Sequence, residues 1–151
     1  MNAHVHSPLP DTDAPHRIEL HIDSRPAQIA SVRRTLEEFA GTVGFDSTTQ
    51  AQLGLCVNEA LANVIRHAYG GVAGKPIVIV AEYDVQATPS PALRVTMRDW
   101  GNGVNPAACT PRPRDPLTPG GVGLICLRSL LDEVTYSPQP DGMLLTMVKK
   151  K

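Results

Sequence analysis

Two runs rich in β-branched residues, 77–84 and 93–99, are joined by a short loop with two prolines, and this arrangement predicts two paired strands. Alternating apolar and polar residues predict a further strand at 16–23, and 133–137 and 143–149 predict a closing hairpin. The fold is therefore constrained by strands that follow one another directly along the sequence.

Helical spacing of apolar residues predicts helices at 26–40, 47–68 and 122–131. The resulting order is strand, helix, helix, strand, strand, loop, helix, strand, strand. It contains too few strand–helix–strand crossovers for a doubly wound parallel sheet. We expect an α+β fold instead, a two-layer α/β sandwich with a mixed, mostly antiparallel sheet and its helices on one face.

The composition suits one domain and excludes several functions. With 151 residues, the chain can build one core without a disulfide or metal. We expect residues 1–15 to form a disordered arm and residues 16–151 to form the folded domain. A net charge of −1 and 4% aromatic residues argue against direct nucleic-acid binding, and no apolar run is long enough to span a membrane. Three widely separated cysteines and the lack of a signal-peptide pattern favour a reduced, cytoplasmic setting.

The helix predicted at 47–68 has the clearest start and stop signals. Ser47 followed by Gln50 forms a capping-box pattern, and Gly70 and Gly71 end the helix. One apolar stripe recurs at helical spacing through Leu53, Val57, Leu61, Val64 and Ala68.

A second line on the same helix, Glu59, Asn63 and His67, lies away from that stripe. A line of this kind usually faces water. Its residue types also suit phosphoryl transfer, because a carboxylate accepts a proton from a hydroxyl and an asparagine carbonyl is a hard ligand for Mg²⁺. A histidine one turn further on could reach a phosphate. The helix alone leaves both interpretations open.

Two glycine motifs further along the chain offer ligand-binding backbone. Asp99, Gly101 and Gly103 form a D-x-G-x-G element directly after a predicted strand. Its aspartate can accept a hydrogen bond from an exocyclic amine such as that of adenine, and its glycines let the backbone approach a ligand closely. An ordinary strand-ending turn is the alternative.

The second motif precedes the helix at 122–131, where free N–H groups and the helix dipole favour phosphate. It consists of Gly120, Gly121, Val122, Gly123 and Leu124. The chain has no G-x-x-x-x-G-K-[ST] sequence, which excludes a P-loop, and no G-x-G-x-x-G between a strand and a helix.

The order and spacing of E-x-x-x-N, D-x-G-x-G and G-x-G-L are those of the ATPase superfamily that includes gyrase, Hsp90, histidine kinases and MutL. Within it, N-E-A-L-A-N-V-I-R-H-A-Y at 58–69, R-D-W-G-N-G at 98–103 and G-V-G-L-I-C-L-R-S-L-L-D-E-V at 121–134 closely resemble the bacterial anti-sigma regulatory factor serine/threonine protein kinases. The resemblance covers about residues 16–150 and implies a left-handed, Bergerat-type ATP-binding fold.

The resemblance also implies roles for individual residues. Glu59 would be the base that activates a serine or threonine hydroxyl, Asn63 would hold Mg²⁺, and Asp99 would bind the adenine amine. The remaining nucleotide-binding residues would be Arg66, His67, Gly101, Gly103, Gly121, Val122, Gly123 and Leu124.

The segment between the glycine motifs, 104–119, would be the ATP lid. A lid arginine, Arg112 or Arg114, would touch the γ-phosphate. Five prolines fall in this segment, and proline cannot continue a helix, so we expect a semi-rigid, mostly non-helical lid.

The chain departs from its relatives at one place. Relatives usually carry a Gly-Thr pair in the last strand region, where the hydroxyl supports adenine binding, and this chain has Gly142 and Met143. Either Thr146 substitutes for that hydroxyl or the contact is missing.

By resemblance, the protein is a serine/threonine protein kinase that binds ATP and Mg²⁺, sequesters a sigma factor and phosphorylates an anti-sigma-factor antagonist. A homodimer is consistent with this resemblance. The alternative is a catalytically weak, nucleotide-dependent binding module that regulates a sigma factor or another regulatory partner.

Overall fold

A computed structural model describes residues 16–102 and 123–151, with the side chains of 123–126 excluded. The predicted arm at 1–15 and lid at 104–119 lie outside the described residues. So do five predicted site residues: Gly103, Arg112, Arg114, Gly121 and Val122.

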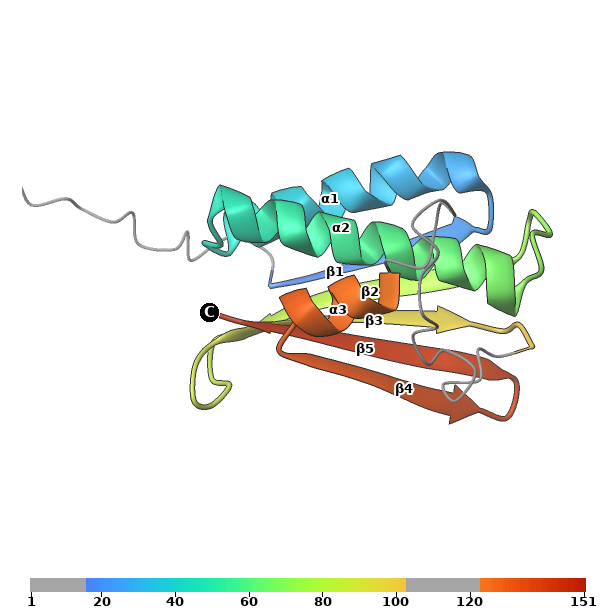
Figure 1. The fold of residues 1–151 in the computed structure, drawn as a ribbon. Helices are drawn as coiled ribbons and strands as arrows, with labels where there is room; N and C mark the ends of the chain where they lie inside the picture. The colour runs from blue at the N-terminus through green and yellow to red at the C-terminus, as the bar shows by residue number, and fades with distance from the viewer. Residues whose placement is uncertain (1–15, 103–122) are drawn as a thin grey trace, which may run out of the picture.

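Five antiparallel strands form one sheet in the order β1-β2-β3-β5-β4 (Figure 1). The strands are β1 Arg17–Asp23, β2 Pro76–Asp84, β3 Ala92–Asp99, β4 Glu133–Gln139 and β5 Gly142–Lys150. All five predicted strands are confirmed, with ends within two residues of those expected. Their burial alternates along the chain, most clearly in β2 and β3, as in strands with one buried face.

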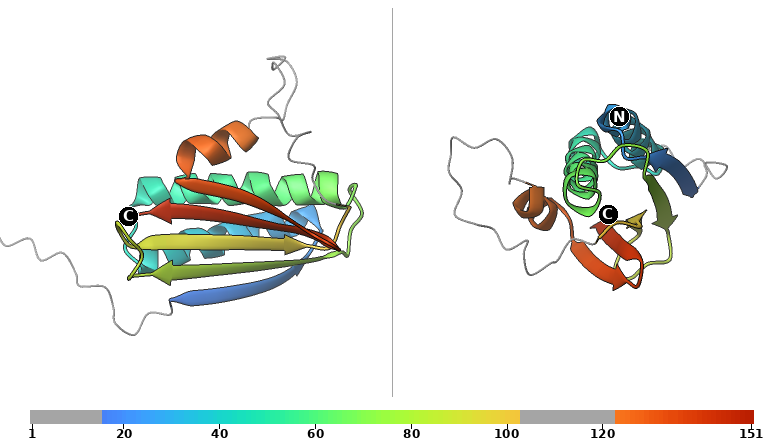
Figure 2. Two further views of the ribbon diagram at one scale, coloured as in Figure 1. Left: turned by 90° about the horizontal axis from the view of Figure 1, so that it is seen from below. Right: turned by 90° about the vertical axis from the view of Figure 1, so that its right-hand side faces the viewer.

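The helices all lie on one face of the sheet, and α2 lies between α1 and α3 (Figure 2). They are η1 Pro26–Gln28, α1 Ile29–Thr42, α2 Ser47–Asn63, η2 Val64–Ala68 and α3 Gly123–Leu130. The helix predicted from residue 26 begins as a 3₁₀ turn, and the one predicted at 47–68 ends in the π-helical turn η2. No helix within the described ranges is long and apolar enough to cross a membrane.

The core lies between α1, α2 and the inner face of the sheet. The predicted apolar stripe of the long helix is buried along its whole length, which confirms the core-facing side. Opposite it lie the inward residues of the two central strands, Ile77, Ile79, Ala81, Val95 and Met97. Burying a side chain such as leucine or isoleucine contributes about 1.5–3 kcal/mol, so this layer fixes the position of α2 over the sheet.

Asp46, not Ser47, is the N-cap of α2, so the predicted capping box is wrong by one residue. Its Oδ1 accepts a hydrogen bond from the backbone N–H of Thr49 at 2.7 Å, and this bond lowers the pKa of the Asp46 carboxyl. Gln50 donates from Nε2 to the carbonyl of Phe45 at 2.8 Å. A carboxylate is also favoured at this helix end by the macrodipole.

We expect Asp46→Ala to lower the thermal unfolding midpoint by about 3 °C, because an N–H of the first turn of α2 loses its acceptor. Ser47→Ala at the adjacent, exposed position is the matched control and should change the midpoint by less than about 1 °C. Thermal unfolding followed by circular dichroism measures both. An equal or larger effect of Ser47→Ala would show that the cap lies at 47.

Candidate functional site

The long helix changes its backbone form directly after Asn63, between the second and third residues of the predicted line of Glu59, Asn63 and His67. After Asn63 the backbone forms the π turn η2, in which the N–H of Tyr69 donates to the carbonyl of Val64 at 3.1 Å. Single π turns are rare and often accompany functional sites. Glu59 and Asn63 are half-buried, whereas Arg66 and His67 in the π turn are exposed.

The turn after β3 is attached to this helix end. The N–H of Asn102 donates to the carbonyl of Ala68 at 3.0 Å, and the N–H of Trp100 donates to the hydroxyl oxygen of Tyr69 at 2.8 Å. A Cβ added at Gly101 would lie 2.3 Å from the Ala68 carbonyl oxygen, so the helix end and the turn approach too closely for any side chain there. The helical motif and the D-x-G motif therefore meet in space.

Tyr69 completes this attachment. Its hydroxyl donates to the carbonyl of Pro76 at 2.6 Å while accepting from Trp100, so one side chain links the helix end to the start of β2 and the end of β3. Burial raises the pKa of this hydroxyl, which keeps it protonated as a donor. Sequence reasoning included Tyr69 in a motif but assigned it no role.

Asp99 is a buried carboxylate, with 1% of its surface exposed. Its Oδ1 accepts from the N–H of Gly101 at 3.0 Å. Desolvation raises the pKa of Asp99, while the backbone N–H groups of Gly101 and Met143 and the charge of Arg98 oppose that rise. A carboxylate has about four acceptor positions, so these two N–H groups leave capacity for a ligand amine.

Glu59 and Asn63 have no ion pair or side-chain hydrogen bond to other described residues. Their donor set fits Mg²⁺, which keeps several waters and takes few protein oxygens, better than an ion that needs a full protein cage. No group of three or more His, Cys, Asp and Glu that could hold a metal occurs among the described residues. The amide oxygen of Asn63 is a hard ligand that could hold a magnesium ion also bound by phosphates.

Thr146 is not brought to this site. It lies three residues beyond Met143 along β5 and pairs with Thr96, and it therefore faces the side of the sheet opposite to Asp99 and Met143. The residue in register with Asp99 is Met143, which is 3% exposed. Of the second glycine motif, Gly123 begins α3, and the side chain of Leu124 lies outside the description.

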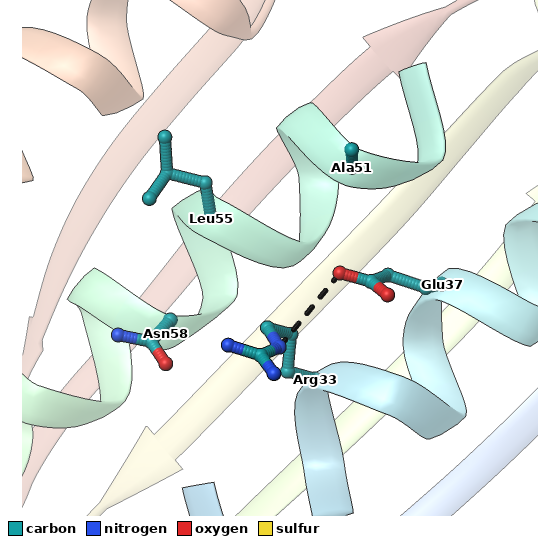
Figure 3. A pocket seen from close by; sticks show the side chains of 5 residues that line it. All are labelled: Arg33, Glu37, Ala51, Leu55 and Asn58. Atoms are coloured by element: carbon teal, nitrogen blue, oxygen red, sulfur yellow. Dashed lines mark ion pairs between the residues drawn. The ribbon is translucent and has the colours of Figure 1, made fainter. Parts of the chain in front are cut away.

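An open groove of about 300 Å³ lies between α1 and α2, away from the sheet (Figure 3). Its lining consists of Arg33, Glu37, Ala51, Leu55 and Asn58. Arg33 and Glu37, one turn apart on α1, form an ion pair along its α1 side at 3.8 Å. The lining includes none of the predicted site residues, so the groove is separate from the site described above.

An antiparallel sheet covered on one face by helices, with the longest helix ending on a turn that holds a buried aspartate, is the architecture of one class of domain. The histidine kinase-like ATPase domain family matches residues 22–149, and the chain belongs to this family. The resemblance stated from the motifs is confirmed.

Relatives of known name are serine-protein kinases RsbW from Bacillus. The chain is 26% identical over 140 residues to the protein of Bacillus pumilus (strain SAFR-032), covering 87% of this chain and 84% of that protein. It is 24% identical over 136 residues to the protein of Bacillus thuringiensis (strain Al Hakam), covering 88% and 84%.

A solved structure with the same fold contains the RsbU and RsbW domains of Rv1364c from Mycobacterium tuberculosis. It superposes with a TM-score of 0.61 at 20% identity, over 88% of this chain. The aligned region is 32% of that longer chain, and the likeness shows the fold.

Asp99 gives the site a pH-dependent stability. Its pKa in the folded state lies above the ordinary value of 3.8, so the folded protein binds this proton more tightly than the unfolded chain does. The carboxyl therefore has no effect below both pKa values and lowers the free energy of unfolding as the pH rises toward its folded-state pKa. The free energy of unfolding of Asp99→Asn minus that of wild type should therefore be larger at about pH 7 than at about pH 4.

Urea unfolding at both pH values measures this difference. Asp84→Asn, at an exposed carboxylate at the far end of β2, is the control and should follow the wild type. A difference between Asp99→Asn and wild type that stays constant or shrinks as the pH rises would contradict the assignment.

Proposed function

We propose that the protein is an ATP-dependent serine/threonine protein kinase that also binds a sigma factor. The observation that supports this most is the junction of two motifs: a buried Asp99 on the turn that is hydrogen-bonded to the end of the helix bearing Glu59 and Asn63. A base-binding acceptor and two half-buried polar groups without described partners are the components that nucleotide-dependent phosphoryl transfer needs. Relatives named serine-protein kinase RsbW support the same activity.

In this proposal the two motifs have separate tasks. Asp99 accepts a hydrogen bond from the adenine amine, the glycine at 101 lets the backbone approach the base, and Asn63 holds Mg²⁺. Bound Mg²⁺–ATP supplies the γ-phosphoryl group, with ADP as the leaving group. Glu59 accepts the proton of the substrate serine or threonine hydroxyl as its oxygen forms the new bond to phosphorus.

The substrate we propose is an anti-sigma-factor antagonist protein, whose unphosphorylated form would compete for the kinase and release the sigma factor. The proposal includes a cytoplasmic setting and a homodimer. Arg66 and His67 are exposed in the π turn, at the helix end next to Asn63, and we assign them to the phosphates. The predicted lid arginines, Arg112 or Arg114, and the glycines at 121 and 123 belong to the same proposal.

One observation favours the alternative of a binding module with little chemistry. Met143 offers no hydroxyl beside Asp99. The adenine ring would therefore have fewer polar partners than in a site with threonine at this position. In this case the protein would bind nucleotide and partner without transferring phosphate.

We expect Glu59→Gln to lower the rate of phosphoryl transfer by about 10²–10⁴-fold, because the substitution removes the general base while keeping the volume of the side chain. The dissociation constant for Mg²⁺–ATP should stay within about threefold, because Asp99 and the turn are untouched. Radiolabel transfer from Mg²⁺–ATP to antagonist proteins of the same organism gives the rate, and titration calorimetry gives the affinity.

Glu38→Gln on the exposed side of α1 is the matched control and should behave as wild type. Full activity of Glu59→Gln would show that Glu59 is not the general base. Wild-type protein that binds both ATP and antagonist but forms no phosphoserine or phosphothreonine would establish the binding module instead.

A further inference from the structure

Arg98 precedes Asp99 on β3 and faces the side of the sheet that the described helices leave uncovered. Its side chain is 21% exposed, and the guanidinium has three neighbours. Nη1 donates to the backbone carbonyl of Asp99, Nη2 pairs with the carboxylate of Asp141, and Cζ lies 4.6 Å from the centroid of the Trp100 ring. One side chain therefore contacts three parts of the turn region.

The peptide that joins Asp99 to Trp100 is held on both sides. Arg98 binds its carbonyl, and the hydroxyl of Tyr69 binds its N–H. The next N–H, that of Gly101, donates to the Asp99 carboxylate. The orientation of the carboxylate thus depends on the plane of this peptide, and Arg98 fixes that plane from the side opposite the helices.

The turn between β4 and β5 contacts the same carbonyl. A Cβ added at Gly142 would lie 2.0 Å from the Asp99 carbonyl oxygen, so the turn approaches as closely as glycine allows. Asp141, in this turn, is the ion-pair partner of Arg98, and Met143, which follows it, donates its N–H to the Asp99 carboxylate. Arg98 therefore connects the β4–β5 turn to the end of β3 where Asp99 lies.

We propose that Arg98 is a positioning residue for nucleotide binding, which orients the Asp99 carboxylate through the Asp99–Trp100 peptide. This inference rests on the proposed function, because it assumes that Asp99 binds the base. Arginine suits the task because its planar guanidinium can donate in two directions and stack on an aromatic ring at the same time. Lysine keeps the charge but has a single ammonium group and no flat face.

We expect Arg98→Ala to raise the KM and the dissociation constant for Mg²⁺–ATP about tenfold, the effect of losing roughly one charge-assisted hydrogen bond. The kcat at saturating ATP should stay within about threefold, since Glu59 and Asn63 lie on α2. Arg98→Lys should recover only a minor part of the affinity. Asp141→Asn should have a small effect, because this carboxylate is 63% exposed and exposed ion pairs contribute little.

Arg94→Ala is the matched control, since Arg94 lies on the same strand and face but is exposed and distant from the turn. A second readout needs no ligand. Trp100 is the single tryptophan of the chain, so its fluorescence should change in Arg98→Ala and stay as in wild type in Arg94→Ala. Thermal unfolding identifies any variant that fails to fold, in which case Arg98→Lys decides.

Wild-type ATP affinity in folded Arg98→Ala, or in Arg98→Lys if the alanine variant does not fold, would overturn the positioning role while leaving the proposed function intact. Equal losses of kcat and affinity would also overturn it, because they indicate general disruption. Wild-type protein that binds no ATP would overturn the proposed function, and the inference with it.

Discussion

The hydrogen bonds between the end of the long helix and the turn after β3 determine where every described group of the site lies. Asn102 bonds to Ala68 and Trp100 to Tyr69, while Gly101 permits contact too close for a side chain. Because these segments are more than thirty residues apart in sequence, neither motif alone forms a site. Core packing brings α2 onto the sheet, and this polar contact then fixes its end against the turn that follows β3.

Other groups of the turn and of the neighbouring strand explain how the fold tolerates a buried carboxylate. Taking a carboxylate out of water is costly unless charges or hydrogen bonds replace the lost hydration. For Asp99 the replacement is partial, because two backbone N–H groups and the nearby charge of Arg98 oppose the desolvation but its pKa still rises. A hydrophobic residue in place of Asp99 would avoid the cost of desolvating a carboxylate. Retention of an incompletely compensated acid is typical of functional sites.

The strands and the buried helix face could be predicted because their periodicities are local and strong. The apolar stripe through Leu53, Val57 and Leu61 repeats at helical spacing, and the inward residues of β2 and β3 alternate. The cap of α2 could not be located as well, because residues 46–49 are all suitable acceptors. The path of the chain out of α1 decides which of them adopts the extended backbone of an N-cap, and Asp46 does so.

Other features depend on contacts that no local pattern contains. The π turn at Val64–Ala68 accompanies the attachment of Tyr69 and Ala68 to a distant turn, and the helical spacing of the sequence does not predict it. The contacts of Arg98 require the position of a turn more than forty residues away. The placement of Thr146 was different, because strand alternation alone puts residues 143 and 146 on opposite faces.

The position of Met143 limits the ways in which this chain could recognise an adenine base. With Thr146 on the other face, the Asp99 carboxylate accepts from the backbone N–H groups of Gly101 and Met143, and the side chain in register with it on β5 is the apolar one of Met143. Backbone N–H groups cannot rotate to compensate for a shift of the carboxylate, so their hydrogen bonds hold only while the peptide planes stay fixed. Where β5 supplies no hydroxyl to share the hydrogen bond, discrimination for an amine would depend on how rigidly one carboxylate is held. If Asp99 binds the base as proposed, the contacts around the Asp99–Trp100 peptide would then matter to binding as much as the carboxylate itself.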